Sequence, residues 1–225
     1  MARPFTASDD QILLAARKVM SKRGPDAFSI AEVASEVGLS RAAIILRFKS
    51  TQALKIASLT NMVEQFTQAL DSLPTTRSGD NVLRLAAFIG SYVRSRESSA
   101  KFFASYSVNV QDQELVELEV RRGAALRKAV SNVMPPVAIE HESAITAFCA
   151  HLSGSIVAWL ALSDSDSRGY VVTRTREWLK LSGIQFSEAV VEELTAPSST
   201  PPRAKTARSV KRTKPRLKAA KSGDE

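Results

Sequence analysis

The sequence predicts an all-α protein, and three observations support this prediction. Apolar residues recur three and four positions apart through most of the chain, which is the period of a helix with one buried face. Helix-forming residues dominate, and glycine and proline are sparse before residue 196. Serine or threonine precedes several of the periodic segments, at the position where these residues cap helices. We therefore expect helices joined by short loops.

The first helix is expected over residues 8 to 23. It should stop at Gly24 and Pro25, because a proline cannot continue the helix beyond the glycine. The segment is amphipathic, since its apolar residues gather on one face at helical spacing. These residues are Ile12, Leu13, Ala16, Val19 and Met20.

Residues 29 to 50 have the pattern of two short helices joined by a tight turn. Ser29 is a good N-cap, and Glu32 stands three positions later, where it would complete a capping box. Gly38 supplies the backbone angles of a sharp helix exit, and Ser40 caps a second helix that begins with Arg41. This is the order of a helix-turn-helix, whose second helix presents its first residues to the DNA major groove. The alternative is a helical hairpin without a special role.

A further helix is expected to begin after Ser50 or Thr51 and to run to about residue 70. Over about residues 8 to 60, the chain resembles the TetR family of one-component bacterial transcription regulators. The resemblance rests on the order and spacing of the segments Ile12-Leu-Leu-Ala-Ala16, Arg23-Gly24, Ser29-Ile-Ala-Glu-Val-Ala34, Gly38-Leu-Ser40, Phe48-Lys-Ser50 and Ala53-Leu54.

The resemblance implies a chain of three parts. An N-terminal three-helix helix-turn-helix domain (residues 1–56) would bind DNA, and a C-terminal helical bundle (57–196) would bind a ligand and dimerise. A Lys/Arg/Pro/Ala-rich tail (197–225) would follow. The implied protein is a cytoplasmic homodimer that binds double-stranded DNA at a palindromic operator. We expect a repressor more than an activator, responsive to an unidentified small-molecule effector.

The candidate DNA-binding residues lie in and around the second helix of the helix-turn-helix. Arg41 and Arg47 can pair with guanine or hold phosphates, and Ala42 or Ala43 can pack on a thymine methyl. The family usually has tyrosine where this chain has Ile45 and lysine where it has Thr51, so two phosphate contacts are weakened. The full set is Ser29, Ser40, Arg41, Ala42, Ala43, Ile45, Arg47, Lys49, Ser50 and Thr51.

The second domain is expected to be a bundle of amphipathic helices. An apolar stripe runs from Val82 to Val93, and a short aromatic-rich segment follows at 102–108. Helices are then expected over residues 113–133, 139–162, 168–182 and 187–195. Aromatic residues in such a bundle are mostly core, but some can line a ligand cavity. The candidates for ligand contact are Phe88, Tyr92, Phe103, Tyr106, Phe148 and His151.

A stripe of small residues marks one face of the expected helix 139–162, and such a stripe lets another helix approach closely. In the resembled family the corresponding helices build an intersubunit four-helix bundle, and a helix-turn-helix binds paired half-sites as a dimer. We therefore assign the stripe to a dimer interface, with packing inside the monomer core as the alternative. Its members are Ala147, Ala150, Gly154, Ala158 and Ala161.

The net charge of +8 is divided unevenly along the chain. Residues 1–56 hold nine Lys/Arg against five Asp/Glu, residues 57–196 hold thirteen against sixteen, and residues 197–225 hold nine against two. The last segment has too few apolar residues to bury a core, so we expect it to be disordered. It can contact DNA phosphates without sequence preference, or it can be a solubilising extension. A DNA-architectural protein that binds mainly through this tail, without a ligand, is the alternative function.

Enzymatic function classes are disfavoured by the motifs that the sequence lacks. It has no glycine-rich phosphate loop, no serine nucleophile elbow and no paired Cys or His at ligand spacing. We therefore expect no catalytic residue, metal or cofactor. The single cysteine, Cys149, excludes an intramolecular disulfide and favours a reducing cytoplasm. The N-terminus lacks an apolar run, and we expect no stretch long enough to span a bilayer, hence no membrane partner.

Overall fold

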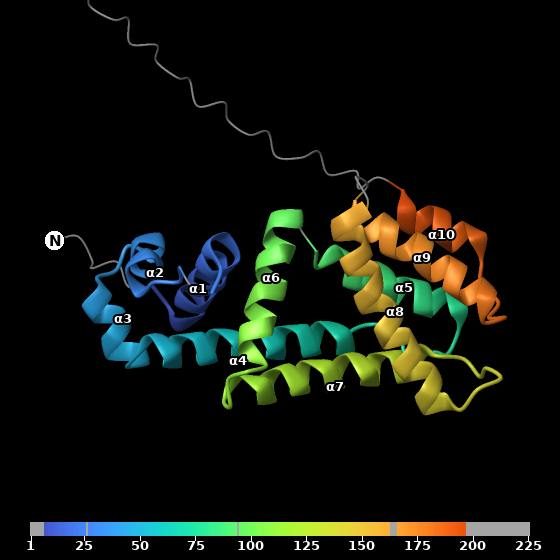
Figure 1. Ribbon diagram of the computed structural model, residues 1–225, viewed down its shortest axis with the longest axis horizontal. Helices are drawn as coiled ribbons and strands as arrows, with labels where there is room; N and C mark the ends of the chain where they lie inside the picture. The colour runs from blue at the N-terminus through green and yellow to red at the C-terminus, as the bar shows by residue number, and fades with distance from the viewer. Residues whose placement is uncertain (1–6, 26, 94, 163–165, 197–225) are drawn as a thin grey trace, which may run out of the picture.

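The computed structural model describes residues 7–25, 27–93, 95–162 and 166–196 of the 225-residue chain. Within these ranges all regular structure is helical, and ten helices follow one another as α1 to α10 (Figure 1). The prediction of an all-α fold is confirmed. The predicted basic tail, residues 197–225, lies outside the described residues.

The head comprises residues 7–56 and is built from three helices and the first turns of a fourth. α1 (Asp9–Arg23), α2 (Ile30–Val37) and α3 (Arg41–Phe48) share one apolar core, which the start of α4 (Thr51–Asp71) completes. Each of the four helices places one fully buried side chain in this core, which fixes the angles at which they cross. These side chains are Ile12, Val33, Ile44 and Leu54.

The body comprises residues 57–196 and contains the rest of α4 and six further helices. They are α5 (Gly79–Ser91), α6 (Arg96–Asn109), α7 (Leu115–Val133), α8 (His141–Leu162), α9 (Ser167–Leu181) and α10 (Glu188–Thr195). α5 packs against α7, α8, α9 and α10, so it lies at the centre of the body (Figure 1). The largest fully buried side chains of the body's core are Leu83, Leu85, Met134, Ile145, Phe148, Leu152 and Leu179.

The head and the body are joined by α4, which packs against α1 of the head and against α7 of the body. The predicted boundary between residues 56 and 57 therefore falls inside one continuous helix of 21 residues. Two side-chain contacts reinforce this connection. Gln52 Nε2 donates to Asp112 Oδ2 at 3.0 Å, and Lys101 Nζ of α6 donates to the carbonyl oxygen of Lys22 at the end of α1.

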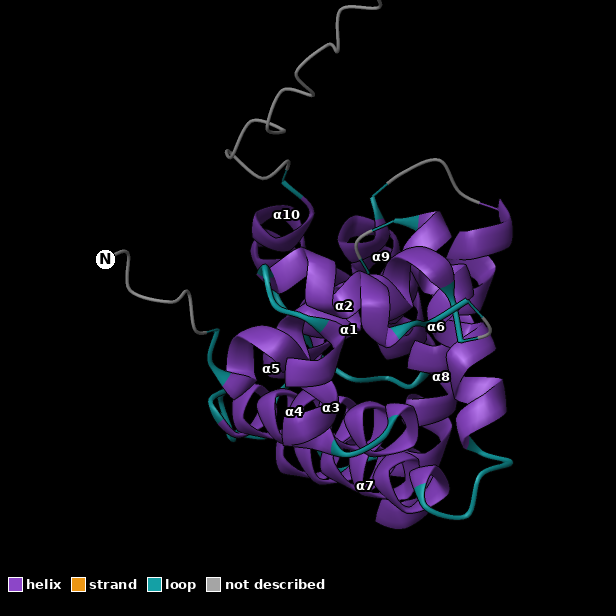
Figure 2. Ribbon diagram, turned by 90° about the vertical axis from the view of Figure 1, so that its left-hand side faces the viewer, coloured by secondary structure: helices purple, strands orange, loops and turns teal. Residues whose placement is uncertain are grey.

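The aromatic-rich segment expected at 102–108 is part of a full helix, α6, which stands between the head and the body (Figure 1). Figure 2, viewed from the head end, draws the described chain as helices joined by loops. Its sequence shows no apolar stripe because its contacts are largely polar, and Ser99 is its one buried residue among those described. Asn109 donates to the carboxylate of the buried Glu119 on α7 at 2.8 Å, and Arg122 donates to the same carboxylate at 2.7 Å. Hydrogen bonds thus hold α6 in place, and the periodicity of apolar residues does not predict them.

The expectation that no segment is long enough to cross a membrane was wrong for α8. Its 22 residues are long and apolar enough for that by length and composition alone. The expectation failed because alanines and single polar residues interrupt the run of large apolar side chains, although the helix as a whole remains apolar. A core helix of a soluble protein passes the same test, so the finding is weak evidence for a membrane.

Candidate nucleic-acid interface

The turn between α2 and α3 is set by local hydrogen bonds. Ser29 Oγ accepts from the Glu32 amide at 3.2 Å and caps the start of α2. Gly38 ends α2 with φ 67°, in the left-handed region that costs glycine least, and the Leu39 amide donates back to Ala34. Ser40 Oγ then accepts from the Ala43 amide at 3.1 Å and starts α3. The predicted cap residues and glycine turn are therefore present.

The capping box expected at Ser29 is replaced by an ion pair. The Glu32 carboxylate accepts from Arg23 Nε at 2.8 Å and from Arg23 Nη2 at 2.6 Å, which ties the start of α2 to the end of α1. A full capping box occurs at Ser8 instead, where Ser8 and Gln11 exchange hydrogen bonds. Glu32 thus bonds Arg23, the cation that the fold brings near it, and not the Ser29 amide that a capping box requires.

α3 lies at the end of the molecule farthest from α8, α9 and α10 (Figure 1). Its inner face is anchored by Ile44, which is 0% exposed, while Ala43 is half-buried. Its outer face carries Arg41, Ala42, Ile45 and Leu46, all of them exposed. This is the geometry of a helix that can enter a groove side-on, because its inner face is buried and its outer face is exposed.

Arg47 points away from that outer face. Its Nη1 donates to the carbonyl oxygen of Ala7 at 2.5 Å and lies 3.5 Å from Asp9 Oδ1, and its side chain is 33% exposed. Arg47 therefore ties α3 to the N-terminus of α1. A contact between Arg47 and DNA remains a prediction, and the structure gives this side chain a positioning role.

The segment between α3 and α4 brings the other candidate residues together. Lys49 ends α3 with φ 69°, and its Nζ donates to the Leu46 carbonyl oxygen at 2.9 Å. Ser50 Oγ accepts from the Ala53 amide at 3.0 Å, and Thr51 stands exposed in the first turn of α4. Backbone amides at a helix N-terminus favour anions, so this corner of the head suits a DNA phosphate.

Leu46 was missing from the candidate residues, although 74% of it is exposed beside the fully buried Ile44. Leucine in an apolar helix suggests a core position, and only the phase of the helix distinguishes the two faces. That phase was available in the sequence, because Ile44 and Phe48 are four residues apart and define the inner face.

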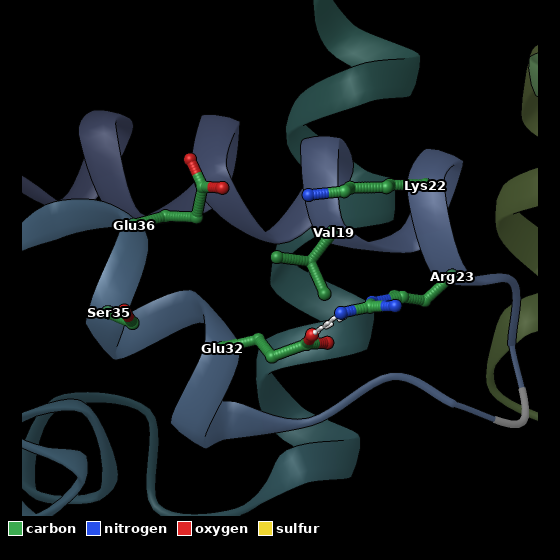
Figure 3. Close-up of a pocket in the computed structure, with 6 residues that line it drawn as sticks. All are labelled: Val19, Lys22, Arg23, Glu32, Ser35 and Glu36. Carbon is green, nitrogen blue, oxygen red and sulfur yellow. Dashed lines mark hydrogen bonds and ion pairs between the residues drawn. The ribbon is translucent and has the colours of Figure 1, made fainter. Parts of the chain in front are cut away.

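A pocket of about 430 Å³ lies in the head between α1 and α2. Figure 3 shows its lining, which is mainly charged: Val19, Lys22, Arg23, Glu32, Ser35 and Glu36. Arg23 pairs with Glu32, and the hydrogen bond from Lys18 holds the pKa of the Glu36 carboxyl below its ordinary value. Exposed pairs of this kind add little stability, and the charges of both signs already neutralise one another.

The candidate ligand residues are not brought to one place by ring contacts. Phe88 of α5 and Tyr92, which follows the last residue of α5, lie 5.0 Å apart, centroid to centroid, and both contact Phe66 of α4. Phe103 contacts Phe102 on α6, and the Tyr106 ring lies 5.5 Å from the Arg122 guanidinium. Their ring contacts thus form separate groups on α5 and α6.

The third group of candidate ligand residues belongs to α8 and α9. Phe148 is fully buried and packs on Trp178 with ring centroids 4.8 Å apart, so its role in this structure is core packing. The His151 ring stacks on Phe148, and its Nε2 lies 3.4 Å from Thr175 Oγ1. Desolvation by burial lowers the pKa of His151, and Arg174 adds to this while Glu177 opposes it. His151 is a half-buried core histidine with one polar partner.

The small-residue stripe lies on the surface of α8. Ala147, Ala150, Gly154 and Ala161 are exposed, Ala158 is partly exposed, and a Cβ placed on Gly154 would meet no atom within 4 Å. Within the described residues, the stripe is therefore not used for close packing. Cys149 on the same helix is half-buried and free, and burial raises the pKa of its thiol.

The residues that the structure describes include no group of three or more His, Cys, Asp or Glu side chains that could hold a metal ion. The two histidines of α8 have separate neighbours, since His141 Nε2 lies 3.3 Å from Ser131 Oγ.

Comparison with known proteins bears on the head and on the whole fold. Residues 12–57 match the sequence model of the family described as "Bacterial regulatory proteins, tetR family". A search of curated proteins finds no match. The matched segment runs from the first turn of α1 to the second turn of α4, so it covers the helix-turn-helix described above.

Solved structures with the same fold cover most of the chain. A TetR transcription regulator from Haloarcula marismortui is 16% identical with a TM-score of 0.63, and the match covers 78% of this chain and 97% of that one. A transcriptional regulator from Saccharomonospora viridis in complex with choline is 16% identical with a TM-score of 0.63, and the match covers 76% of this chain and 94% of that one. The regulator FadR from Bacillus subtilis in complex with stearoyl-CoA is 14% identical with a TM-score of 0.58, and the match covers 79% of this chain and 100% of that one.

At these identities, the likeness to solved structures establishes the fold of the chain. The family match establishes the type of its head. The head, matched over residues 12–57, is therefore similar to the tetR family, and the fold of the chain is similar to that of solved TetR transcription regulators.

Proposed function

We propose that this protein is a sequence-specific DNA-binding transcription regulator that acts as a homodimer on a palindromic operator, and that it is a ligand-responsive repressor. The observation that carries the proposal is the outward face of α3, held by one buried residue at the far end of the molecule. Such a helix is positioned to enter the major groove. The protein works in the cytoplasm, where bacterial DNA lies, and we propose no enzymatic activity.

The exposed stripe on α8 supports the homodimer. Close packing within this chain does not use Ala147, Ala150, Gly154 or Ala161, and Val157 and Leu162 on the same helix are also exposed. Leu181 at the end of the neighbouring α9 adds a further exposed apolar side chain. A second copy of the chain would remove this surface from water and set two α3 helices in a fixed relation.

The dimer is tested by Gly154→Arg, which places a long charged side chain in the middle of the stripe. The space around Gly154 is open in this chain, so the fold should tolerate the substitution. We expect monomers with unchanged helicity and lost operator binding, measured by sedimentation and circular dichroism. Loss of helicity together with the dimer would instead assign the stripe to the monomer core.

The response to a small molecule is supported by the similar structures, which were solved with choline and with stearoyl-CoA bound to those proteins. In this chain, a ligand beside Phe88 and Tyr92 would be next to α4, the helix that joins the body to the head, because both rings contact Phe66. α4 and the contact from Lys101 to Lys22 at the end of α1 would transmit a movement of the body to the head. A ligand can shift the equilibrium only by the difference in its affinities for the two states.

The alternative function is a DNA-architectural protein that binds without a ligand through its basic tail. It is favoured by the composition of residues 197–225, which hold nine Lys/Arg against two Asp/Glu. Ending the chain after Ala196 tests this directly. Each lost phosphate contact should reduce the slope of log affinity against log salt by about 0.9, with a similar loss on specific and random DNA.

The decisive experiment for the main proposal is selection of bound fragments from random-sequence duplex DNA, followed by footprinting on the selected site. We expect one enriched palindrome and protection of a short segment with two-fold symmetry. Enrichment of no sequence, with protection that spreads along the duplex without register, would contradict a regulator and support the architectural protein.

A further inference from the structure

We propose that the head recognises its operator mainly through thymine methyl groups, which pack against the aliphatic side chains of Ile45 and Leu46. This inference rests on the proposed function, because it concerns what α3 contacts in a DNA site. It names Leu46 as a specificity-determining residue and the 5-methyl group of thymine as the chemical feature that this residue recognises.

The first step concerns the arrangement of side chains around α3. At about 100° per residue, Arg41, Ala42, Ile45 and Leu46 span about 140° of the helix surface. The anchor Ile44 points to the opposite side, into the core shared by α1, α2 and α4. The outer face is therefore one arginine beside three aliphatic side chains, of which Leu46 is 74% exposed and Ile45 36% exposed.

The second step concerns the groups that could form hydrogen bonds with base edges. α3 carries two residues with polar side chains, Arg41 and Arg47. Arg47 lies about 100° beyond Leu46 around the helix, where it bonds the Ala7 carbonyl oxygen and pairs with Asp9. Arg41 is left as the only side chain of α3 on the outer face that can donate to a base. One donor on the outer face of α3 cannot distinguish a whole half-site.

The third step concerns the chemistry of the major groove. Of the four bases, only thymine presents an apolar group there, its 5-methyl, and the other edges present donors and acceptors. An aliphatic side chain gains free energy from contact with that methyl, whereas it would take the polar edges out of water without replacing their hydrogen bonds. Removal of one buried methyl from such a contact corresponds to about a fourfold change in affinity.

The fourth step concerns the occupant of this apolar face. Within the described part of the chain, nothing covers Leu46 although its neighbour Ile44 is completely buried. The surroundings indicate a polyanion: Arg41 borders the face, the amides at the N-terminus of α4 follow it, and residues 1–56 hold nine Lys/Arg against five Asp/Glu. Duplex DNA supplies both the anionic backbone and the methyl group.

The experiment uses the full chain and a duplex selected from random-sequence DNA. Each thymidine of the half-site is replaced in turn by deoxyuridine, which removes the methyl and leaves the base pair intact. We expect one or two positions at which symmetric replacement in both half-sites weakens binding by roughly fifteenfold, since two methyls are lost. Wild-type affinity for the duplex with every half-site thymidine replaced would overturn the proposal.

To test whether Leu46 is the residue that contacts the methyl, the replacement of thymidine by deoxyuridine is combined with Leu46→Ala. This variant should fold normally, because the side chain that it shortens is exposed, and its thermal midpoint provides the check. We expect Leu46→Ala to bind the thymidine and deoxyuridine duplexes with nearly equal affinity at the critical position. If the variant still discriminates as the wild type does, Leu46 does not contact the methyl and the proposal fails.

Leu14→Ala is the matched control, because Leu14 is also an exposed leucine of the head but lies on α1. It should keep the full discrimination between thymidine and deoxyuridine. Failure of the proposed function itself has a different signature, since a protein that enriches no sequence from random DNA provides no half-site to modify.

Discussion

The head and the body achieve order in different ways. α2 and α3 of the head have eight residues each, and isolated helices of that length are unstable in water. Both are held by a serine cap at one end, a positive-φ residue at the other, and few buried side chains. α5 of the body buries eight of its thirteen residues and needs no such turn. A helix ordered by its ends keeps its surface available for a partner, whereas a helix ordered by burial does not.

The largest effect should come from removing a buried ring in the body. Phe148 is fully buried, and its ring packs on Trp178 and His151. Phe148→Ala should lower the free energy of unfolding by about 3–5 kcal/mol, because it removes buried area and leaves a cavity. Denaturant unfolding followed by circular dichroism measures this loss. A change below about 1 kcal/mol would show that the body is not ordered mainly by burial.

A smaller effect, on binding alone, should separate the two arginines of α3. Arg41 is exposed on the outer face, so Arg41→Ala should weaken binding to the selected site by about 1–3 kcal/mol if it pairs with guanine. Its thermal midpoint should not change.

Arg47→Ala is the comparison, because Arg47 is bonded within the head. We expect Arg47→Ala to lower the thermal midpoint and to weaken binding to the selected site and to random DNA by a similar factor. The measurements are operator titrations and thermal melts of both variants. If Arg47→Ala relaxed preference at one base pair without loss of stability, Arg47 would contact a base instead.

Removal of a cap in the head should have an effect of about 1 kcal/mol. Ser40 Oγ satisfies the Ala43 amide, so Ser40→Ala should destabilise α3 by about 0.5–2 kcal/mol. Ser35→Ala is the control, because Ser35 is exposed inside α2, where alanine is the better helix former. Hydrogen exchange of the α3 amides measures the stability of this helix in both variants. Equal protection in the two variants would show that α3 is ordered by its packing and not by its ends.

The smallest effect concerns pH and the body. Burial lowers the pKa of His151 below 6.5, so the unfolded chain binds a proton more readily than the folded one. The stability contributed by neutral His151 is present above pH 6.5 and is lost as the pH falls below that value. His151→Gln should flatten this part of the stability profile, measured by denaturant unfolding at several pH values. An identical slope in both proteins would exclude His151 as its cause.

The fold could be predicted to a large extent because most of its determinants are local. The start of α1 at Ser8, the turn at Gly38 and the cap at Ser40 each depend on residues within four positions. α6 could be predicted less well, because bonds from Lys101 and Asn109 to distant residues hold it in place. Helix periodicity contains no information about such partners.

The candidate site could be predicted in its position but not in the orientation of its side chains. The sequence places Arg41 and Arg47 on the same short helix, and only the fold brings Ala7 and Asp9 next to the second of them. The ligand residues show the same limit. Phe88 and Phe148 are both aromatic residues on apolar helices, and their ring contacts turn out to be with different neighbours.

Because α4 is one unbroken helix, it fixes how the head is rotated relative to the body. Its 21 residues contain no glycine or proline and extend about 30 Å, so the helix transmits rotation as well as position. One residue inserted near its middle would turn the head about 100° relative to the body. In a dimer joined through the body, the number of residues in α4 therefore determines which face of the double helix each α3 meets.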